Sequence, residues 1–115
     1  MLARPNRLIK ADDFRSAMRQ GRKVGSEHLV TYLQRDETQS HTRFGFVVAK
    51  TVGGAVKRNL VKRRMREIAR ELLKEYPSGF TAVVRALPGS AEIDWPTLRN
   101  ELRSSVQTGV KKTAG

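Results

Sequence analysis

The residues best suited to chemistry form one basic run. Seven lysine and arginine residues and a single acid, Glu67, lie between Lys57 and Arg70, in the stretch KRNLVKRRMREIAR. Guanidinium and ammonium groups bind phosphate oxygens through charge-assisted hydrogen bonds. Cations four residues apart in a helix, such as Lys62 and Arg66, repel each other by about 0.2–0.5 kcal/mol. Because a bound polyanion converts this repulsion into attraction, the run predicts a phosphate-binding surface.

The charge of the whole chain points the same way. The sequence holds 23 lysine and arginine residues against 11 aspartate and glutamate residues, a net charge of +12, which predicts nucleic acid or an anionic membrane surface as the partner. It holds no cysteine, which excludes disulfides, thiolate metal sites and a cysteine nucleophile. The N-terminus lacks a secretory signal, and the longest apolar run, Phe44–Ala49, is far below the roughly 20 residues that span a bilayer. We expect a soluble, cytoplasmic protein.

The elements that position the basic run belong to one domain, residues 1–115, whose ends at 1–6 and 110–115 should fray. Turn signals and hydrophobic spacing predict the order α-β-β-β-α-β-α. The segments 27–34 and 43–50 should be antiparallel strands joined by a loop, with a small edge strand at 22–25. A helix that ends near 76 then leads to a strand at 80–87, which predicts a parallel β-α-β crossover. The fold class is α+β, an α/β sandwich with a mixed sheet of about four strands and three helices.

The basic helix has two opposite faces. At 100° per residue its apolar residues share one sector, which should pack on the sheet: Val61, Met65, Ile68, Ala69, Leu72 and Leu73. The opposite side carries Asn59, Arg63, Arg66 and Arg70, with Lys62 on its flank. The glycines that precede the helix, Gly53 and Gly54, leave backbone N–H groups aimed at an anion. The helix therefore covers the sheet with one face and presents a row of cations on the other.

Other interpretations of the basic helix stay open. It could be a solvated face, or an amphipathic helix for a membrane surface or a calmodulin-type partner, although its apolar face has no Trp or Phe and is needed by the sheet. DNA reading is disfavoured because no zinc ligands, heptads or helix-turn-helix pair are visible. Clustered arginine with few base-reading groups fits backbone recognition of structured RNA. A ribosomal or other structural RNA-binding protein shares this charge and size.

The residues around the basic run resemble a known family. Arg58 to Arg66 match R-N-x-x-K-R-x-x-R and Lys50 to Val56 match K-x-x-G-x-A-V, the signature and lead-in of the bacterial ribonuclease P protein subunit. Further matches at Arg7-Leu8, Asp13-Phe14, Gly21 and the strand from Arg43 extend the resemblance over residues 4–108. The resemblance implies a left-handed β-α-β crossover, whereas pattern alone favours the right-handed sense.

The resemblance also implies a function: a ribonucleoprotein endonuclease that removes the 5′ leader from precursor tRNA. The RNA subunit would perform Mg²⁺-dependent hydrolysis, so the protein would have no catalytic residue, no metal ligand and no organic cofactor. Its partners would be that catalytic RNA and precursor tRNA, with no membrane. The catalytic RNA would contact Arg58, Asn59, Lys62, Arg63 and Arg66, and the basic helix adds Lys57 and Arg70. The leader would run through a cleft lined by Phe14, Met18, Tyr32 and Lys50, with Arg15 nearby.

Two of these cleft residues have a plainer interpretation. Phe14 and Tyr32 suit base stacking, at about 1–3 kcal/mol per base, but either could be an ordinary core residue. Met18 lies where the family often has a second aromatic, so a methionine contact replaces stacking there.

A protein-borne active site is the competing class. His28 and His41 could form an acid–base pair, and Asp12-Asp13 could hold Mg²⁺. We expect neither, because the histidines lack an orienting neighbour in sequence and the aspartates are better explained as helix caps. We also expect the free protein to bind sulfate or phosphate, because a bound anion relieves the self-repulsion of a chain at +12.

Overall fold

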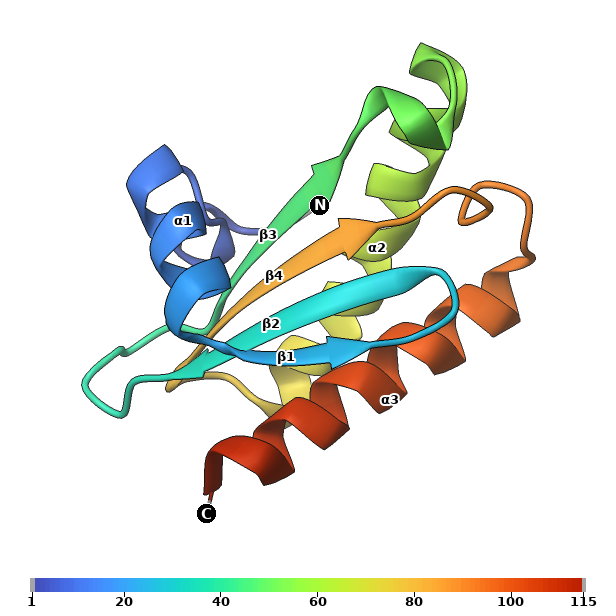
Figure 1. The fold of residues 1–115 in the computed structure, drawn as a ribbon. Coiled ribbons are helices and arrows are strands. Elements are labelled where there is room, and N and C mark those ends of the chain that lie inside the picture. Colours follow the sequence, from blue (N-terminus) through green and yellow to red (C-terminus); the bar gives the residue numbers. More distant parts are fainter. Residues whose placement is uncertain (1, 115) are drawn as a thin grey trace.

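The computed structural model describes residues 2–114, in which three helices surround one four-stranded sheet (Figure 1). This composition confirms the predicted fold class and element order. In chain order the elements are α1 (Ala11–Gln20), β1 (Arg22–Gly25), β2 (Leu29–Arg35), β3 (Arg43–Val48), α2 (Ala55–Glu75), β4 (Phe80–Ala86) and α3 (Trp95–Ala114), with short 3₁₀ turns at Arg4–Asn6 and Lys50–Val52. None of the helices described is long and apolar enough to cross a membrane.

The strands lie in the order β1-β2-β4-β3. β4 pairs parallel with β3 and antiparallel with β2, so the predicted parallel crossover is confirmed. The strands β2 and β3 run in opposite directions as expected, but they are not neighbours, because β4 lies between them. The residues of β4 suit this central place, because six of the seven are buried. In Figure 1 α2 lies behind the sheet and β4 lies to the right of β3, which gives the crossover its left-handed sense.

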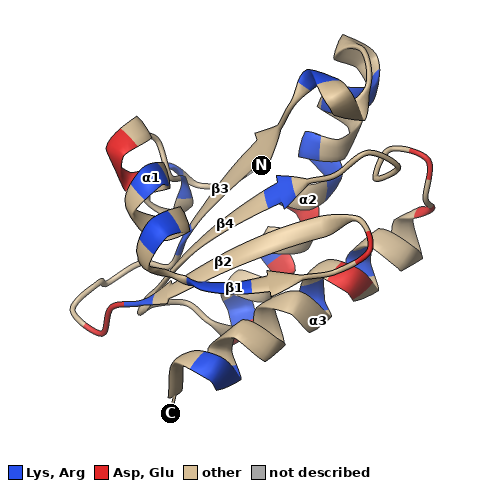
Figure 2. Ribbon diagram, in the orientation of Figure 1, with Lys and Arg blue, Asp and Glu red and all other residues tan. Residues whose placement is uncertain are grey.

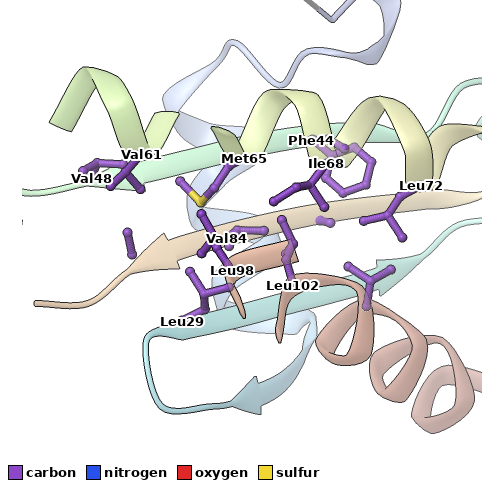
Figure 3. Packing of buried hydrophobic residues seen from close by; sticks show 14 of the residues in the cluster. Leu29, Phe44, Val48, Val61, Met65, Ile68, Leu72, Val84, Leu98 and Leu102 are labelled. Carbon is purple, nitrogen blue, oxygen red and sulfur yellow. The ribbon is translucent and has the colours of Figure 1, made fainter. Parts of the chain in front are cut away.

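The main core lies between the sheet and the pair of helices α2 and α3. The helix α2 buries Val61, Met65, Ile68, Ala69 and Leu72, as its periodicity predicts, and Leu73 is half-buried. Figure 3 shows Met65 and Ile68 against the sheet, with Leu98 and Leu102 of α3 reaching the same space. This packing fixes the rotation of α2 about its axis. Its basic side must therefore face outward.

The helix ends follow local chemistry, with one correction. The Oδ1 atom of Asp94 accepts a hydrogen bond from the backbone N–H of Thr97 at 3.0 Å, which caps the N-terminus of α3. Hydrogen bonds from Thr97 lower the pKa of the Asp94 carboxyl. The prediction that Asp12 and Asp13 cap α1 is wrong: the N-cap is Lys10, and no side chain caps that end. The two aspartates lie inside the first turn, where the helix dipole favours negative charge.

The two ends of the chain are placed by contacts. Leu2 is buried in the main core, and the side-chain amide of Asn6 donates to the carbonyl of Thr42 at 2.9 Å. The helix α3 continues to Ala114. The first segment predicted to fray, 1–6, thus contains the buried Leu2 and the hydrogen-bonded Asn6, and the second, 110–115, is helical from 110 to 114, while residues 1 and 115 lie outside the described part. The fraying itself stays a prediction.

Candidate nucleic-acid interface

The basic side of α2 carries a row of cations that faces away from the sheet. Four residues predicted to face outward are exposed: Asn59, Arg63, Arg66 and Arg70. Arg58 and Lys62 are half-buried along the flank, and Lys57 is exposed in the first turn. Figure 2 shows the lysine and arginine segments gathered toward the N-terminal part of α2 and the acidic ones toward its C-terminal part. The residues predicted to contact the catalytic RNA therefore lie together on one helix.

Protein partners neutralise only some of these cations. Lys57 lies 3.5 Å from Glu92, and Arg70 lies 3.3 Å from Glu67. Arg64 points away from the row and donates to the carbonyl of Ile93 at 3.0 Å. Within residues 2–114, no acidic side chain forms an ion pair with the cations at the centre of the row, which are Lys62, Arg63 and Arg66. With Asn59 and Glu67 they line an open hollow of about 520 Å³. Three cations without an acidic partner among the described residues therefore lie around one hollow, which is an arrangement suited to a polyanion.

The turn that precedes α2 leaves its first amides accessible. Gly53 has a φ of 151°, which side chains rarely adopt, and a Cβ atom there would lie 2.7 Å from Cδ of Lys57. Gly54 is the N-cap and has no side chain to bond the first-turn N–H groups. The positive end of the helix dipole therefore adds to the charge of the row.

A second surface lies on the opposite face of the sheet, which α1 covers. There a small cluster of Leu8, Ala17 and Val83 supports three of the predicted cleft residues: Phe14, Met18 and Tyr32. Phe14 comes so close to the sheet that a Cβ atom on Gly45 would lie 2.5 Å from its ring. All three predicted side chains are half-buried, so they pack against the cluster and keep accessible surface as well.

The strand register adds two cations to this surface that sequence reasoning missed. Lys23 pairs directly with Tyr32, so both side chains lie on the face that α1 covers. Arg85 lies two residues after Val83 on the central strand, points to the same face and is exposed. An arginine on a central strand whose other residues are buried is itself a signal of an open sheet face. The sequence alone therefore contained a sign that Arg85 is exposed. The position of Lys23 beside Tyr32 follows only from the strand register.

The remaining predicted cleft residues lie around this face. Lys50 is exposed in the 3₁₀ turn after β3, and the last pairs of β3 with β4 place it at the same end of the sheet as Arg85. Arg15 is exposed on α1 and pairs with Asp12. The α1-facing side of the sheet and the helix beside it therefore combine accessible aromatic surface with several cations. We call this surface the open sheet face, defined by Phe14, Met18, Lys23, Tyr32 and Arg85.

The candidate acid–base residues are not brought together. His28 precedes β2 and His41 follows it, so the length of that strand, about 20 Å, lies between them. His28 is instead bound to α3: its Nδ1 atom lies 2.8 Å from Oε1 of Glu101, and Oε2 of the same carboxylate accepts a hydrogen bond from the Ser26 hydroxyl. Burial alone would raise the pKa of the Glu101 carboxyl, but hydrogen bonds from Ser26 and His28 outweigh burial and lower it. These contacts hold the turn between β1 and β2 against α3.

The aspartates offered as Mg²⁺ ligands have other partners. Asp12 pairs with Arg15, and Oδ2 of Asp13 lies 3.4 Å from Nη1 of Arg43. No group of three histidine, aspartate or glutamate side chains suited to a metal ion occurs within residues 2–114.

This chain is similar in sequence and in fold to known proteins. A family model described as Ribonuclease P matches residues 2–109. The chain belongs to the ribonuclease P protein family. It is 41% identical to the ribonuclease P protein component of Arthrobacter sp. (strain FB24), over 100% of this chain and 85% of that protein. Its identity to the component of Streptomyces griseus is 43%, over 93% and 94% of the two chains.

A solved structure agrees with the assignment. The ribonuclease P protein of Staphylococcus aureus superposes with a TM-score of 0.79 at 26% identity, covering 90% of this chain and 94% of that one. Proteins of this family are the protein component of the endoribonuclease that matures the 5′ end of tRNA, and they partner with the ribonuclease P RNA. The predicted family, enzyme class and tRNA-processing role are thereby confirmed.

Proposed function

We propose that this protein binds the catalytic RNA of ribonuclease P with the basic side of α2 and the 5′ leader of precursor tRNA with the open sheet face. Bound in this way, it promotes endonucleolytic removal of the leader. Mg²⁺ acts in the RNA subunit, which performs the hydrolysis, and the protein supplies no catalytic group or organic cofactor. The reaction takes place in the cytoplasm, without a membrane partner.

One observation carries the first half of this proposal: Lys62, Arg63 and Arg66 line one open hollow and have no acidic partner among the described residues. Like-charge neighbours on a helix destabilise it by about 0.2–0.5 kcal/mol per pair, and a bound anion would relieve that repulsion. In a family that works with an RNA subunit, phosphate groups of that RNA are the anion at hand.

The second half of the proposal, binding of the leader, rests on the open sheet face. A single RNA strand binds through bases stacked on aromatic side chains and phosphates held by cations. Phe14 and Tyr32 supply the ring surfaces, Met18 adds a polarisable contact, and Lys23 and Arg85 supply the charge.

The test is cleavage of precursor tRNA at low Mg²⁺ concentration. Three reactions are compared: the protein alone, the cognate ribonuclease P RNA alone, and both together. We expect cleavage at the mature 5′ end to be strong only in the mixture. A precursor with a leader of one nucleotide is the matched substrate control, because it removes the contact with the open sheet face and should lower the stimulation.

Two results would contradict the proposal. Cleavage by the protein alone that His28→Ala or Asp13→Ala abolishes would place the chemistry on the protein. No stimulation in the mixture, with a folded protein, would favour a structural RNA-binding role instead.

A further inference from the structure

A small hollow of about 150 Å³ lies at the outer edge of β3, between the N-terminal segment and α2. Its inner wall is apolar and includes Leu2, Phe44 and Phe46. Cations surround it: Arg7 comes from the N-terminal segment, and Lys62 and Arg66 come from α2. Neither Phe46 nor Arg7 is among the residues predicted from the sequence to bind RNA.

The N-terminal segment builds one side of the hollow by pairing with the sheet edge. The backbone N–H of Leu8 donates to the carbonyl of Phe44 at 2.9 Å, and Arg7 forms a parallel bridge with Phe44. This bridge, the one isolated pairing found within residues 2–114, ends at Phe44. Because backbone groups alternate along a strand, the N–H and C=O of Phe46 also point to the outer edge, where a ligand can reach them.

Phe46 has an unusual position for a large aromatic residue. It lies on an edge strand and is only half-buried, although its side chain points toward α2. Its ring is stacked parallel to that of the buried Phe44, with 6.2 Å between the ring centroids and 9° between the planes. Phe44 therefore fixes the plane of the Phe46 ring, and the fixed ring can form a stacking platform.

We infer that this hollow binds one unstacked nucleotide of RNA. Its base stacks against Phe46 and bonds the edge of β3, and its phosphate lies between Arg7, Lys62 and Arg66. The hollow is smaller than the roughly 300–1,000 Å³ of sites for larger ligands, which fits a single planar ring. Single-stranded RNA binds through bases stacked on aromatic side chains and phosphates held by cations, and this hollow combines both features. An inorganic anion would contact the cations but not the apolar wall.

The inference rests on the proposed function, because it takes the nucleotide from one of the two RNA partners proposed above. The hollow shares Lys62 and Arg66 with the basic side of α2, which points to an unpaired nucleotide of the catalytic RNA. It also includes Phe14 of the open sheet face, from which the leader could reach it. Both sources present the same ligand chemistry, and binding experiments separate them.

The test compares Phe46→Leu, which keeps apolar volume but removes stacking, with wild type and with Phe46→Tyr, which restores the ring. Tyr76→Leu is the matched control, since Tyr76 is also half-buried and aromatic but lies at the far end of α2. Two affinities are measured at fixed salt: protein for catalytic RNA, and the protein–RNA complex for precursor tRNA with and without its leader. We expect Phe46→Leu to weaken one of them about five- to hundredfold, without changing its salt dependence.

The outcomes are distinct. A loss in the first affinity assigns the nucleotide to the catalytic RNA, and a loss confined to substrates with a leader assigns it to the leader. Wild-type affinities in a folded Phe46→Leu variant would overturn the inference and leave the proposed function intact. Failure of the wild-type protein to bind the catalytic RNA would overturn both. Arg7→Ala should reduce the salt slope of the affected affinity by about one unit, and an unchanged slope would exclude Arg7 as a phosphate ligand.

Discussion

Both halves of α2 bury one face in the core, but they differ in the charge of their exposed side chains. Residues 55–66 contain six lysine and arginine residues and no acid, whereas residues 67–75 contain two and three acids. In the second half Glu71 receives a hydrogen bond from Nε of Arg99 at 2.8 Å, and Arg103 pairs with both Glu71 and Glu75. The hydrogen bond from Arg99 lowers the pKa of the Glu71 carboxyl. The three acids of the second half, Glu67, Glu71 and Glu75, are thus paired with arginines of the protein.

The difference shows which cations serve the fold. The pairs between α2 and α3 are partly exposed, so each contributes about 1 kcal/mol or less, but together they orient α3. Lys62, Arg63 and Arg66 contribute nothing of this kind and destabilise the free helix through mutual repulsion. Unpaired charge on a rigid, packed helix is the arrangement expected of a binding surface, and paired charge is that of a structural contact.

The largest expected effect comes from reversing charge in each half. Arg63→Glu with Arg66→Glu should weaken binding of the catalytic RNA by about a hundredfold or more, because two phosphate contacts become repulsions. Lys74→Glu, an exposed change on the second half, should leave the affinity within a fewfold of wild type. Filter binding at one salt concentration measures both. The double variant changes the net charge by −4 and Lys74→Glu changes it by −2, so a loss of binding free energy in Lys74→Glu half as large as in the double variant would mean that only net charge matters and that the two halves do not differ.

A smaller effect is expected on the open sheet face. Lys23→Ala with Arg85→Ala should weaken binding of precursor tRNA to the protein–RNA complex by roughly tenfold and leave binding of the catalytic RNA unchanged. Mature tRNA, which has no leader, is the control ligand and should bind the variant and wild type equally. A loss of catalytic-RNA affinity in this variant would instead place that RNA on the open sheet face.

Anions should stabilise the free protein by binding near Lys62, Arg63 and Arg66, which have no acidic partner among the described residues. Sulfate at ten times its dissociation constant would add about 1.4 kcal/mol, which raises the melting temperature by roughly 5 °C. Chloride at matched ionic strength is the control for screening, and Arg63→Ala with Arg66→Ala should reduce the sulfate effect. Equal shifts in sulfate and chloride would argue against a specific anion site.

Acid should act on the paired contacts of α3 instead. Because the folded-state pKa of Glu101 is lowered, its contribution to stability is present above its unfolded pKa and is lost as the pH falls through the folded value. Glu101→Gln should lower the free energy of unfolding by about 1–3 kcal/mol at pH 7, and this difference should shrink as the pH falls below the unfolded pKa of a glutamate. Urea unfolding at pH 7 and below that pKa measures this. A constant difference between the two proteins would show that the charge of Glu101 is not involved.

The sequence predicted what local periodicity controls. The spacing of Val61, Met65 and Ile68 identified the packed side of α2, and by exclusion its basic side, because burial of an apolar face decides how a helix is rotated. Asp94 was recognisable as a cap because its hydrogen bond spans only three residues.

What the sequence left undetermined depends on pairing between distant segments. The insertion of β4 between β2 and β3, and the register that places Lys23 beside Tyr32, follow from contacts across the whole sheet. The N-terminal segment has no strand pattern of its own, so its bridge to Phe44 and the hollow beside Phe46 were not predictable from residue types.

The most direct test of the central claim is the salt dependence of catalytic-RNA binding. Affinities of wild type, of Arg63→Ala with Arg66→Ala, and of Lys74→Ala are measured over a series of salt concentrations and plotted as log K against log salt. We predict that the double variant loses about two units of slope, one for each phosphate contact, while Lys74→Ala keeps the wild-type slope. A wild-type slope in the double variant would contradict the account, because the RNA would then not bind at Arg63 and Arg66.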